Sequence, residues 1–273
     1  MTAGIPPNAT GVPSNALEIK RYLDILRILV ERNLKLRYRG SILGIYWSLL
    51  NPLIMTAIYA AIFGQAFAAY YDNSIVSYTL AAFTGMVVIN FFSTSTSQAL
   101  SSVVNSSTLL NRMKLPMSAF PVSMIAANVY QLAMSTLPLL AIATLIFSGS
   151  LINVMALLLP LTGLVMICTG VGLIVSALNV FFRDLPYFYE LVTFGLWISS
   201  PIFYPAEIVP DNVRRFLIFN PIAPIISSVR QIVLSGDSPD LTAMLPILPS
   251  SILLLAIGWF SFKWQKSQFM DLL

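Results

Sequence analysis

A basic segment that runs directly into apolar sequence is the feature that most constrains how this chain can fold. Seven of its fifteen Lys and Arg residues lie between Lys20 and Arg39, and the next basic residue is Arg112. An apolar stretch begins at Ile42, just after the basic segment ends. Clustered Lys and Arg beside long apolar runs are typical of membrane proteins, whose positive segments stay on the cytoplasmic side. The junction therefore predicts an N-terminal region at the cytoplasmic surface, followed by membrane-spanning helices.

The composition leaves too few charged residues for a soluble globular fold. Charged residues make up 10% of the 273 residues and hydrophobic residues 57%, with a mean hydropathy of +0.82. A soluble domain has about 25% charged residues. The net charge of +4 is explained by basic residues that bind anionic lipid, so we do not predict nucleic-acid binding.

Residue types needed for several kinds of catalytic or metal site are missing. The chain has no His, which removes the commonest general base and metal ligand of neutral pH. Its single cysteine, Cys168, can form neither an internal disulfide nor a cysteine metal cluster, and its apolar neighbours predict a small buried residue. We expect this chain to bind no metal ion and no cofactor of its own.

The N-terminal region divides into a tail and a helix. Residues 1–15 are polar and rich in Pro and Gly, which predicts a disordered cytoplasmic tail without a cleavable signal peptide. In residues 16–39, apolar residues recur every three or four positions, as in an amphipathic helix that lies in the membrane interface. These apolar residues are Ile19, Tyr22, Leu23, Leu26, Leu29, Val30 and Leu34.

Six segments of residues 40–273 are apolar over about the 20 residues that a membrane-spanning helix needs. They are approximately 42–67, 76–98, 118–147, 152–181, 187–205 and 243–262. Residues 206–240 hold shorter apolar stretches, which predict an outer re-entrant hairpin that turns at Asn220 and Pro221; a loop folded over the outer mouth is the alternative. The predicted fold class is an all-α polytopic membrane protein: an amphipathic interface helix, six transmembrane helices and this hairpin before the last one.

The distribution of basic residues predicts the orientation of the spans. With the N-terminus inside, twelve of the fifteen Lys and Arg residues fall in cytoplasmic segments, and Arg214, Arg215 and Arg230 fall outside. This bias follows the positive-inside rule. Six spans then place both termini in the cytoplasm.

Several segments, in a fixed order, resemble one family of membrane proteins. They are LKLRYRGSILGIYWSLLNPL (Leu34–Leu53), NVFFRDLPYFYELV (Asn179–Val192) followed by SPIFYP (Ser200–Pro205), and FNPIAPIISSVRQIVLSG (Phe219–Gly236). These segments are similar to those of the permease subunits of ABC-type exporters that move capsule, O-antigen or teichoic-acid polysaccharides. The resemblance implies a homodimer in the bacterial cytoplasmic (inner) membrane, together with two copies of an ABC ATPase subunit that bind ATP and Mg²⁺.

Three residues near the start of the first span are candidates for a cytoplasmic gate. Arg37 and Arg39 can hold the phosphate of membrane lipid or of a lipid-linked glycan substrate, and Trp47 lies where interfacial aromatic rings gather. The alternative is that both arginines only anchor the topology.

Aromatic side chains are candidates for the lining of a glycan passage. Sugar rings present apolar faces that stack on aromatic planes, and the resemblance implies that the first and fifth spans line the passage. The residues concerned are Tyr59, Phe63, Phe67, Phe194, Trp197 and Phe203. Ordinary helix packing or an interface belt is the alternative.

The resemblance also implies a contact with the ATPase in the loop between the second and third spans. There a short coupling helix would dock into the ATPase, although an ordinary connecting loop is the alternative. The contact residues would be Leu109, Leu110, Arg112, Met113, Lys114, Leu115 and Pro116. In the second cytoplasmic loop, Arg183, Asp184 and Glu190 could form an ion pair.

Two absences indicate where the energy for transport comes from. No G-x-x-x-x-G-K-[ST] phosphate-binding loop occurs in the chain. Charged residues are nearly missing from the span interiors, which disfavours an ion-coupled carrier. Both absences fit an energy source in a separate ATPase subunit. Together with the resemblance, they imply the permease subunit of an ATP-driven exporter of a lipid-linked polysaccharide. The alternatives are an exporter of a small hydrophobic drug or lipid, and a membrane glycosyl or phosphoglycosyl transferase, which would need paired acidic residues.

Overall fold

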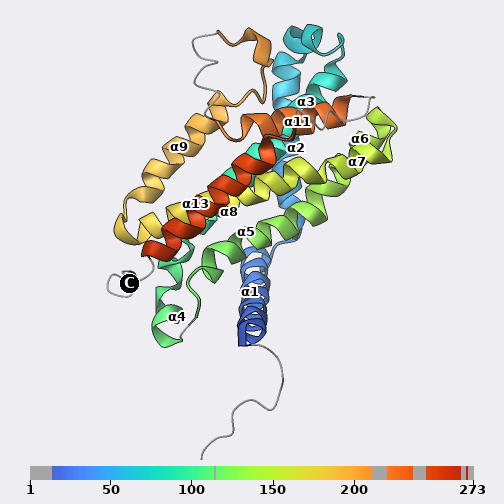
Figure 1. The fold of residues 1–273 in the computed structure, drawn as a ribbon. Coiled ribbons are helices and arrows are strands. Elements are labelled where there is room, and N and C mark those ends of the chain that lie inside the picture. The colour runs from blue at the N-terminus through green and yellow to red at the C-terminus, as the bar shows by residue number, and fades with distance from the viewer. Residues whose placement is uncertain (1–13, 114, 211–219, 236–243, 266–268, 270–273) are drawn as a thin grey trace, which may run out of the picture.

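The structure, a computed structural model, describes residues 14–113, 115–210, 220–235, 244–265 and 269 (Figure 1). Every regular element in these residues is helical, which confirms the predicted all-α class. The α-helices are α1 (Ser14–Tyr38), α2 (Trp47–Phe67), α3 (Ile75–Ser102), α4 (Ser107–Arg112), α5 (Ala119–Gln131), α6 (Leu137–Ser148), α7 (Leu151–Ala156), α8 (Leu158–Phe181), α9 (Leu185–Ser199), α11 (Ala223–Leu234) and α13 (Ile247–Gln265). The short 3-10 segments are η1 (Gly44–Tyr46), η2 (Ala68–Tyr70), η3 (Val104–Ser106) and η5 (Ala206–Ile208), and η4 (Leu132–Thr136) is a π-helix.

Five helical stretches of the described residues are long and apolar enough to cross a membrane. They are Gly44–Tyr70, Ile75–Ser102, Ala119–Ser148, Leu151–Phe181 and Ile247–Gln265. They coincide with five of the six predicted spans to within a few residues at each end. The chain is therefore a multi-pass membrane protein.

The predicted fifth span, 187–205, is shorter in the structure than the sequence suggested. Its helix, α9, ends at Ser199, and Ser200 has an extended backbone with φ −78° and ψ 136°. The cause is Pro201, because a proline disfavours the helical conformation of the residue before it. At 15 residues, α9 falls below the length of about 20 that a perpendicular crossing needs, so the count of six spans stays a prediction.

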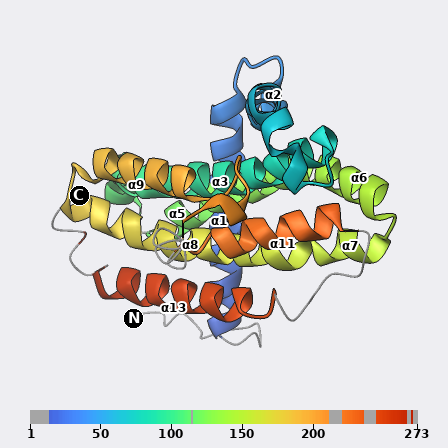
Figure 2. The ribbon, with the colours of Figure 1, turned by 90° about the horizontal axis from the view of Figure 1, so that it is seen from above.

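Helix α3 lies at the centre of the bundle. It contacts α2, α5, α8, α9 and α11, while α1 packs on α5 and α13 packs most extensively against α8. Seen from above in Figure 2, α9 and α2 lie on the α3 side of the bundle and α13 lies on the opposite side of α8. The faces of α3 that meet these neighbours are apolar and fully buried around Val88 and Ile89.

The described part of the predicted outer hairpin is embedded among other helices. Helix α11 contacts α3, α6 and α8, and its buried residues are Ile225, Ile226, Ser228, Val229, Ile232 and Val233. Asn220 makes the turn before it, because its side chain accepts a hydrogen bond from the Ile222 amide at 2.9 Å and donates to Ser200 Oγ at 2.9 Å. Residues 211–219 and 236–240 of the hairpin lie outside the described residues.

The two ends of the bundle differ in what they carry. In Figure 1, α1, α4 and the turn between α8 and α9 lie toward the lower end, and the turn between α6 and α7 lies at the opposite end. A separate apolar cluster joins α1, α4 and α13 at the lower end through Leu29, Leu110 and Phe262. Helix α1, which carries six of the fifteen Lys and Arg residues, is therefore fixed to the same end as α4.

Candidate functional site

Arg37 is the centre of a polar cluster where α1 meets α3 and α5. Its guanidinium donates hydrogen bonds to Asn128 Oδ1 at 2.8 Å, to Gln131 Oε1 at 2.7 Å and to Gln98 Oε1. The Asn128 amide donates in turn to Gln98 Oε1 at 3.0 Å, and the Tyr38 hydroxyl donates to Gln131 Oε1. All of these acceptors are neutral amides. They therefore fix the orientation of the guanidinium without cancelling its positive charge.

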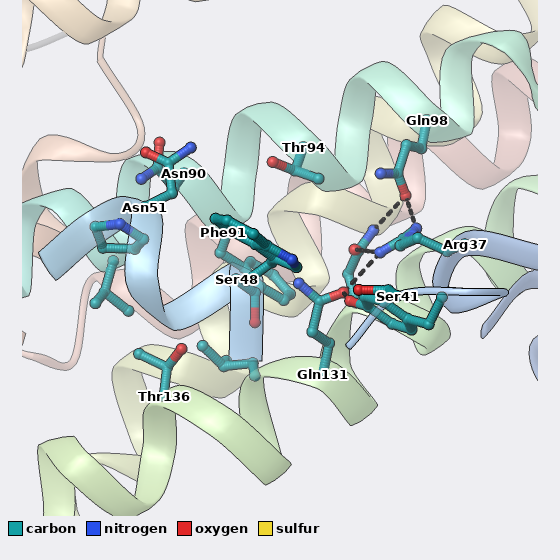
Figure 3. Close-up of a pocket in the computed structure, with 16 residues that line it drawn as sticks. Arg37, Ser41, Ser48, Asn51, Asn90, Phe91, Thr94, Gln98, Gln131 and Thr136 are labelled. Atoms are coloured by element: carbon teal, nitrogen blue, oxygen red, sulfur yellow. Dashed lines mark hydrogen bonds between the residues drawn. The ribbon is translucent and has the colours of Figure 1, made fainter. Parts of the chain in front are cut away.

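The Arg37 cluster forms one wall of a cavity of about 390 Å³ (Figure 3). Among the described residues that line this cavity, Arg37 is the only charged one. The others that carry polar groups are Tyr38, Ser41, Trp47, Ser48, Asn51, Asn90, Thr94, Gln98, Asn128, Gln131 and Thr136. A fixed guanidinium surrounded by hydrogen-bonding side chains is suited to an anionic group such as a phosphate.

A π-helical turn shapes the wall of the cavity opposite α3. The π-helix η4 follows α5 directly and carries Ser135, whose hydroxyl lies 2.9 Å from Ser48 Oγ of α2 and donates to the Gln131 carbonyl at 2.7 Å. Such turns are rare and often occur at functional sites. Here the turn connects α2 to Gln131, one of the residues that hold Arg37.

Of the three predicted gate residues, the structure brings two together. Arg37 and Trp47 line the same cavity, where the Trp47 side chain is 54% exposed. Arg39 follows the last residue of α1, is exposed, and is not among the residues that line the cavity. Phosphate binding stays a prediction, and the geometry centres it on Arg37.

The six predicted passage-lining aromatic residues form one continuous chain of ring contacts, which we call the aromatic chain. In order along it, they are Phe67, Phe63, Tyr59, Phe203, Trp197 and Phe194. Its central contact is a stack of Tyr59 on Phe203 with ring centroids 3.5 Å apart. The aromatic chain thus connects α2 to α9 across the end of α9. These rings pack on one another, and their role in lining a passage stays a prediction.

The backbone that carries Phe203 is held by two side chains from other helices. Arg230 of α11 donates to the carbonyl of Pro201 at 2.7 Å and to that of Ile202 at 3.2 Å, and the Tyr78 hydroxyl of α3 donates to the carbonyl of Phe203 at 2.9 Å. Carbonyl groups beyond a helix end need such partners when they are buried. Arg230 and Tyr78 therefore set the position of Phe203 against Tyr59.

A second cavity, of about 480 Å³, lies between α3 and α9. It is lined by Asn90 and Ser93 of α3, and on α9 by Glu190, Phe194 and Trp197 among others. Asn90 also lines the Arg37 cavity. One face of α3 therefore borders both cavities.

The three charged residues predicted for the second cytoplasmic loop lie partly before α9 and partly on it. Arg183 and Asp184 are exposed in the turn between α8 and α9, and Glu190 is exposed on α9, where it lines the second cavity. An ion pair among the three stays a prediction. Among the described residues, no three His, Cys, Asp or Glu side chains gather closely enough to hold a metal ion.

The leucines of the predicted ATPase-contact segment face the bundle. Leu110 of α4 is 6% exposed and belongs to the apolar cluster of α1 and α13, and Leu109 and Leu115 pack partly buried against that cluster. Pro116 is also partly buried. These residues attach the segment to the chain's own core.

Two residues of the same segment point outward. Arg112 is exposed and Met113 is 53% exposed, so both are available to a partner. Lys114 lies outside the described residues. Contact with an ATPase stays a prediction; of the segment's described residues that it names, Arg112 and Met113 are the exposed ones.

Sequence reasoning missed the residues that orient Arg37 and Phe203. Gln98, Asn128 and Gln131 are amides within predicted spans, and polar residues inside a span are a known signal of a polar cavity. Arg230 was counted only as an outer basic residue of the predicted hairpin, but it lies on α11 with its guanidinium 5.9 Å from the Tyr71 ring centroid. Burial raises the pKa of the Tyr71 hydroxyl, partly offset by Arg230, so this hydroxyl stays protonated at neutral pH.

A sequence model of the family described as ABC-2 type transporter matches residues 25–234, which is well over half of the chain. The chain belongs to the ABC-2 type transporter family. The match runs from α1 to α11, so both cavities and the aromatic chain of this ABC-2 transporter lie within the family region.

Several known proteins are similar to this ABC-2 transporter over most of their length. It is 28% identical over 253 residues to the O-antigen export system permease protein RfbA of Klebsiella pneumoniae, covering 92% of this chain and 95% of the relative. A second protein of that name from the same species is 30% identical over 216 residues, covering 78% and 81%. RfbA of Myxococcus xanthus is 27% identical over 258 residues, covering 93% and 97%. The resemblance to polysaccharide-exporter permeases is confirmed.

Proposed function

We propose that this chain is the membrane subunit of an ATP-driven exporter that moves a lipid-linked polysaccharide from the cytoplasm across the inner membrane. The relatives named as O-antigen export permeases support it, because they match nearly the whole chain. The observation that carries it is the Arg37 cavity. A cation held by neutral amides, at the end of a basic helix, suits the phosphate of a lipid carrier.

The proposal includes six spans with both termini in the cytoplasm. The excess of Lys and Arg on one side supports this orientation, as does the position of α4 at the same end of the bundle as α1. In this orientation the Arg37 cavity opens near the cytoplasmic surface, where a newly made polymer would arrive. The exposed apolar residues of α1, such as Ile19 and Leu23, would face lipid.

The proposed transporter contains two copies of this chain and two copies of an ATPase that binds ATP and Mg²⁺. The apolar residues that α2 and α9 expose, including Ile58, Ile62 and Leu191, are available to face lipid or the second copy. Two-fold symmetry is the commonest arrangement of such assemblies. Arg112 and Met113 would contact the ATPase and transmit its movement to α4.

The test is deletion of this chain in its native cells, followed by return of variants. We expect the deletion to remove polysaccharide from the cell surface and to accumulate lipid-linked polymer inside, and the native chain to restore export. Arg37→Gln with Arg39→Gln should not restore it, although expression and ATP binding by the partner are unchanged. Arg39→Gln alone is the matched control and should restore export, because Arg39 lies outside the cavity.

Two results would contradict the proposal. Normal surface polysaccharide in the deletion strain would exclude polymer export and would direct attention to small hydrophobic molecules. Full export by the double variant would show that both arginines serve only as topology anchors.

A further inference from the structure

The uncovered side of α3 in its second half is entirely polar. Between residues 86 and 102, neighbouring helices bury most of α3. Six residues of this stretch are partly or fully exposed, and all six are polar. They are Asn90, Ser93, Thr94, Ser97, Gln98 and Ser101, and we call them the polar stripe.

Helical spacing places the polar stripe on one face of α3. Asn90, Thr94, Ser97 and Ser101 follow one another at intervals of four, three and four residues, the spacing of neighbours on a helix surface. Eleven residues rise by about 16 Å, roughly half of the hydrocarbon core of a bilayer. Figure 3 shows Asn90, Thr94 and Gln98 in succession along α3 at the Arg37 cavity.

Contact with lipid does not explain this composition. The neighbouring helix α2 exposes Ile54, Ile58 and Ile62, which are 48–64% exposed and apolar, as a lipid-facing surface should be. Polar side chains in membrane helices face the bundle interior or a water-filled cavity. The polar stripe therefore faces water or a polar partner.

The polar stripe joins the two cavities at Asn90. The Asn90 Nδ2 atom is buried, yet it has no hydrogen-bond partner among the described residues. A buried donor without a partner calls for a ligand or an ordered water. Asn90 lines both the Arg37 cavity and the second cavity, and the second cavity reaches Phe194 and Trp197 at the end of the aromatic chain.

We infer that the polar stripe is a wall that binds the hydroxyl groups of the glycan as it crosses the membrane. This inference rests on the proposed function. Ser and Thr hydroxyls can donate or accept and rotate freely, so they can exchange one sugar hydroxyl for the next. The stripe therefore suits a neutral polymer that slides from the Arg37 cavity toward the aromatic chain.

Cysteine labelling tests whether the polar stripe is accessible to water. The single native cysteine, Cys168, is fully buried, so Cys168→Ala provides a background without thiols. Thr94→Cys and Ser97→Cys should react with a charged, lipid-insoluble methanethiosulfonate at least about ten times faster than Ile62→Cys on α2. Equal rates would overturn the inference. The inference would also be overturned if Thr94→Cys did not react with the methanethiosulfonate but formed a disulfide between two copies of the chain. That result would identify the stripe as a protein contact.

Protection by polymer tests the glycan itself. We compare membranes from cells that make the polysaccharide with membranes from cells that do not, and expect the polymer to slow modification of Thr94→Cys several-fold. Rapid modification that the polymer does not change would overturn glycan contact while the deletion phenotype still supports polymer export. Normal surface polysaccharide in the deletion strain is a separate result. It would overturn the proposed function whatever the labelling rates are.

Removal of the hydroxyl groups provides a second variant. The triple variant Ser93→Ala, Thr94→Val and Ser97→Ala keeps the side-chain volumes nearly unchanged, and export of polymer should fall about tenfold at equal expression. Ser95→Ala is the matched control, because Ser95 is buried on the other side of the same helix and its hydroxyl has no partner among the described residues. Equal export by the triple variant and the control would overturn the inference.

Discussion

At the residue scale, two arginines held by neutral oxygen atoms have different surroundings. The acceptors of Arg37 are side-chain amides beside a cavity, which leaves room for an anion. The acceptors of Arg230 are the backbone carbonyls of Pro201 and Ile202, together with that of Ala81 at 3.3 Å. Arg230 therefore replaces hydrogen bonds that the chain loses where α9 ends, and its role is to hold the backbone.

Replacement of Arg230 by Met should destabilise the protein. Met keeps an apolar stem of similar length but leaves the Pro201 and Ile202 carbonyls without their donor. Hydrogen bonds to charged groups contribute about 1.5–3 kcal/mol each, so we expect the free energy of unfolding to fall by about 3 kcal/mol. Thermal unfolding in detergent measures this change. Arg39→Met, at an exposed position, should change stability by less than about 0.5 kcal/mol; equal stability of the two variants would show that the carbonyls do not depend on Arg230.

At the element scale, α8 and α13 touch through their backbones. A Cβ atom on Gly170 would lie 2.8 Å from the Leu255 nitrogen, and one on Gly258 would lie 2.7 Å from the Gly170 Cα. Both distances are shorter than real side-chain contacts allow. Small residues permit such close packing of membrane helices, which is how α13 fits along α8.

Gly170→Ala or Gly258→Ala should therefore separate α8 from α13. Overpacking of this kind costs about 1–3 kcal/mol, which thermal unfolding in detergent would detect. The matched control is Gly195→Ala on α9, where an added Cβ would meet nothing within 4 Å. Similar stability of all three variants would contradict the close crossing.

The segment that contains α4 has a structural face and an exposed face, and variants can separate them. Arg112→Ser with Met113→Ser changes exposed side chains, so we expect normal folding but loss of substrate-stimulated ATP hydrolysis by the partner. Leu110→Ala removes a buried side chain and should instead lower stability by about 2–5 kcal/mol. ATPase assays and thermal unfolding on the purified complex distinguish the two effects. Full stimulation in the double serine variant would exclude this segment as the ATPase contact.

At the scale of the whole molecule, the number of crossings depends on α9. Within the part of the chain that the structure describes, five stretches have full spanning length, whereas α9 has 15 residues and ends at an extended segment. A short or tilted helix can still cross where the bilayer thins locally. The side of the membrane on which its two flanks lie decides between five and six spans.

Two single-cysteine variants in the Cys168→Ala background test this crossing. Arg183 precedes α9 and Glu207 follows it, and both are exposed. We expect a membrane-impermeant maleimide to label Glu207→Cys in intact cells and Arg183→Cys only after permeabilisation. Labelling of both from the same side would mean that α9 does not cross and that the termini lie on opposite sides.

The sequence by itself determined the helical class, five of the spans and the family. These properties are local, because each membrane helix satisfies its own backbone hydrogen bonds and its apolar run is contiguous in the chain. The six aromatic residues could also be selected from the sequence, because their ring side chains suit sugar contact. Only the structure shows that Tyr59 stacks on Phe203, which lies 144 positions further along the chain.

Tertiary structure alone decided which polar groups meet. Arg37 contacts Gln98 and Gln131, which are 61 and 94 positions away, and nothing local in the sequence pairs them. The same holds for Arg230 and the backbone at Pro201, and for the polar stripe, whose six residues were indistinguishable from the buried Ser95 and Thr96 until neighbouring helices covered one side of α3. Hydrophobic runs specify that a helix enters the membrane, but the packing of one helix on another determines which of its faces stays open.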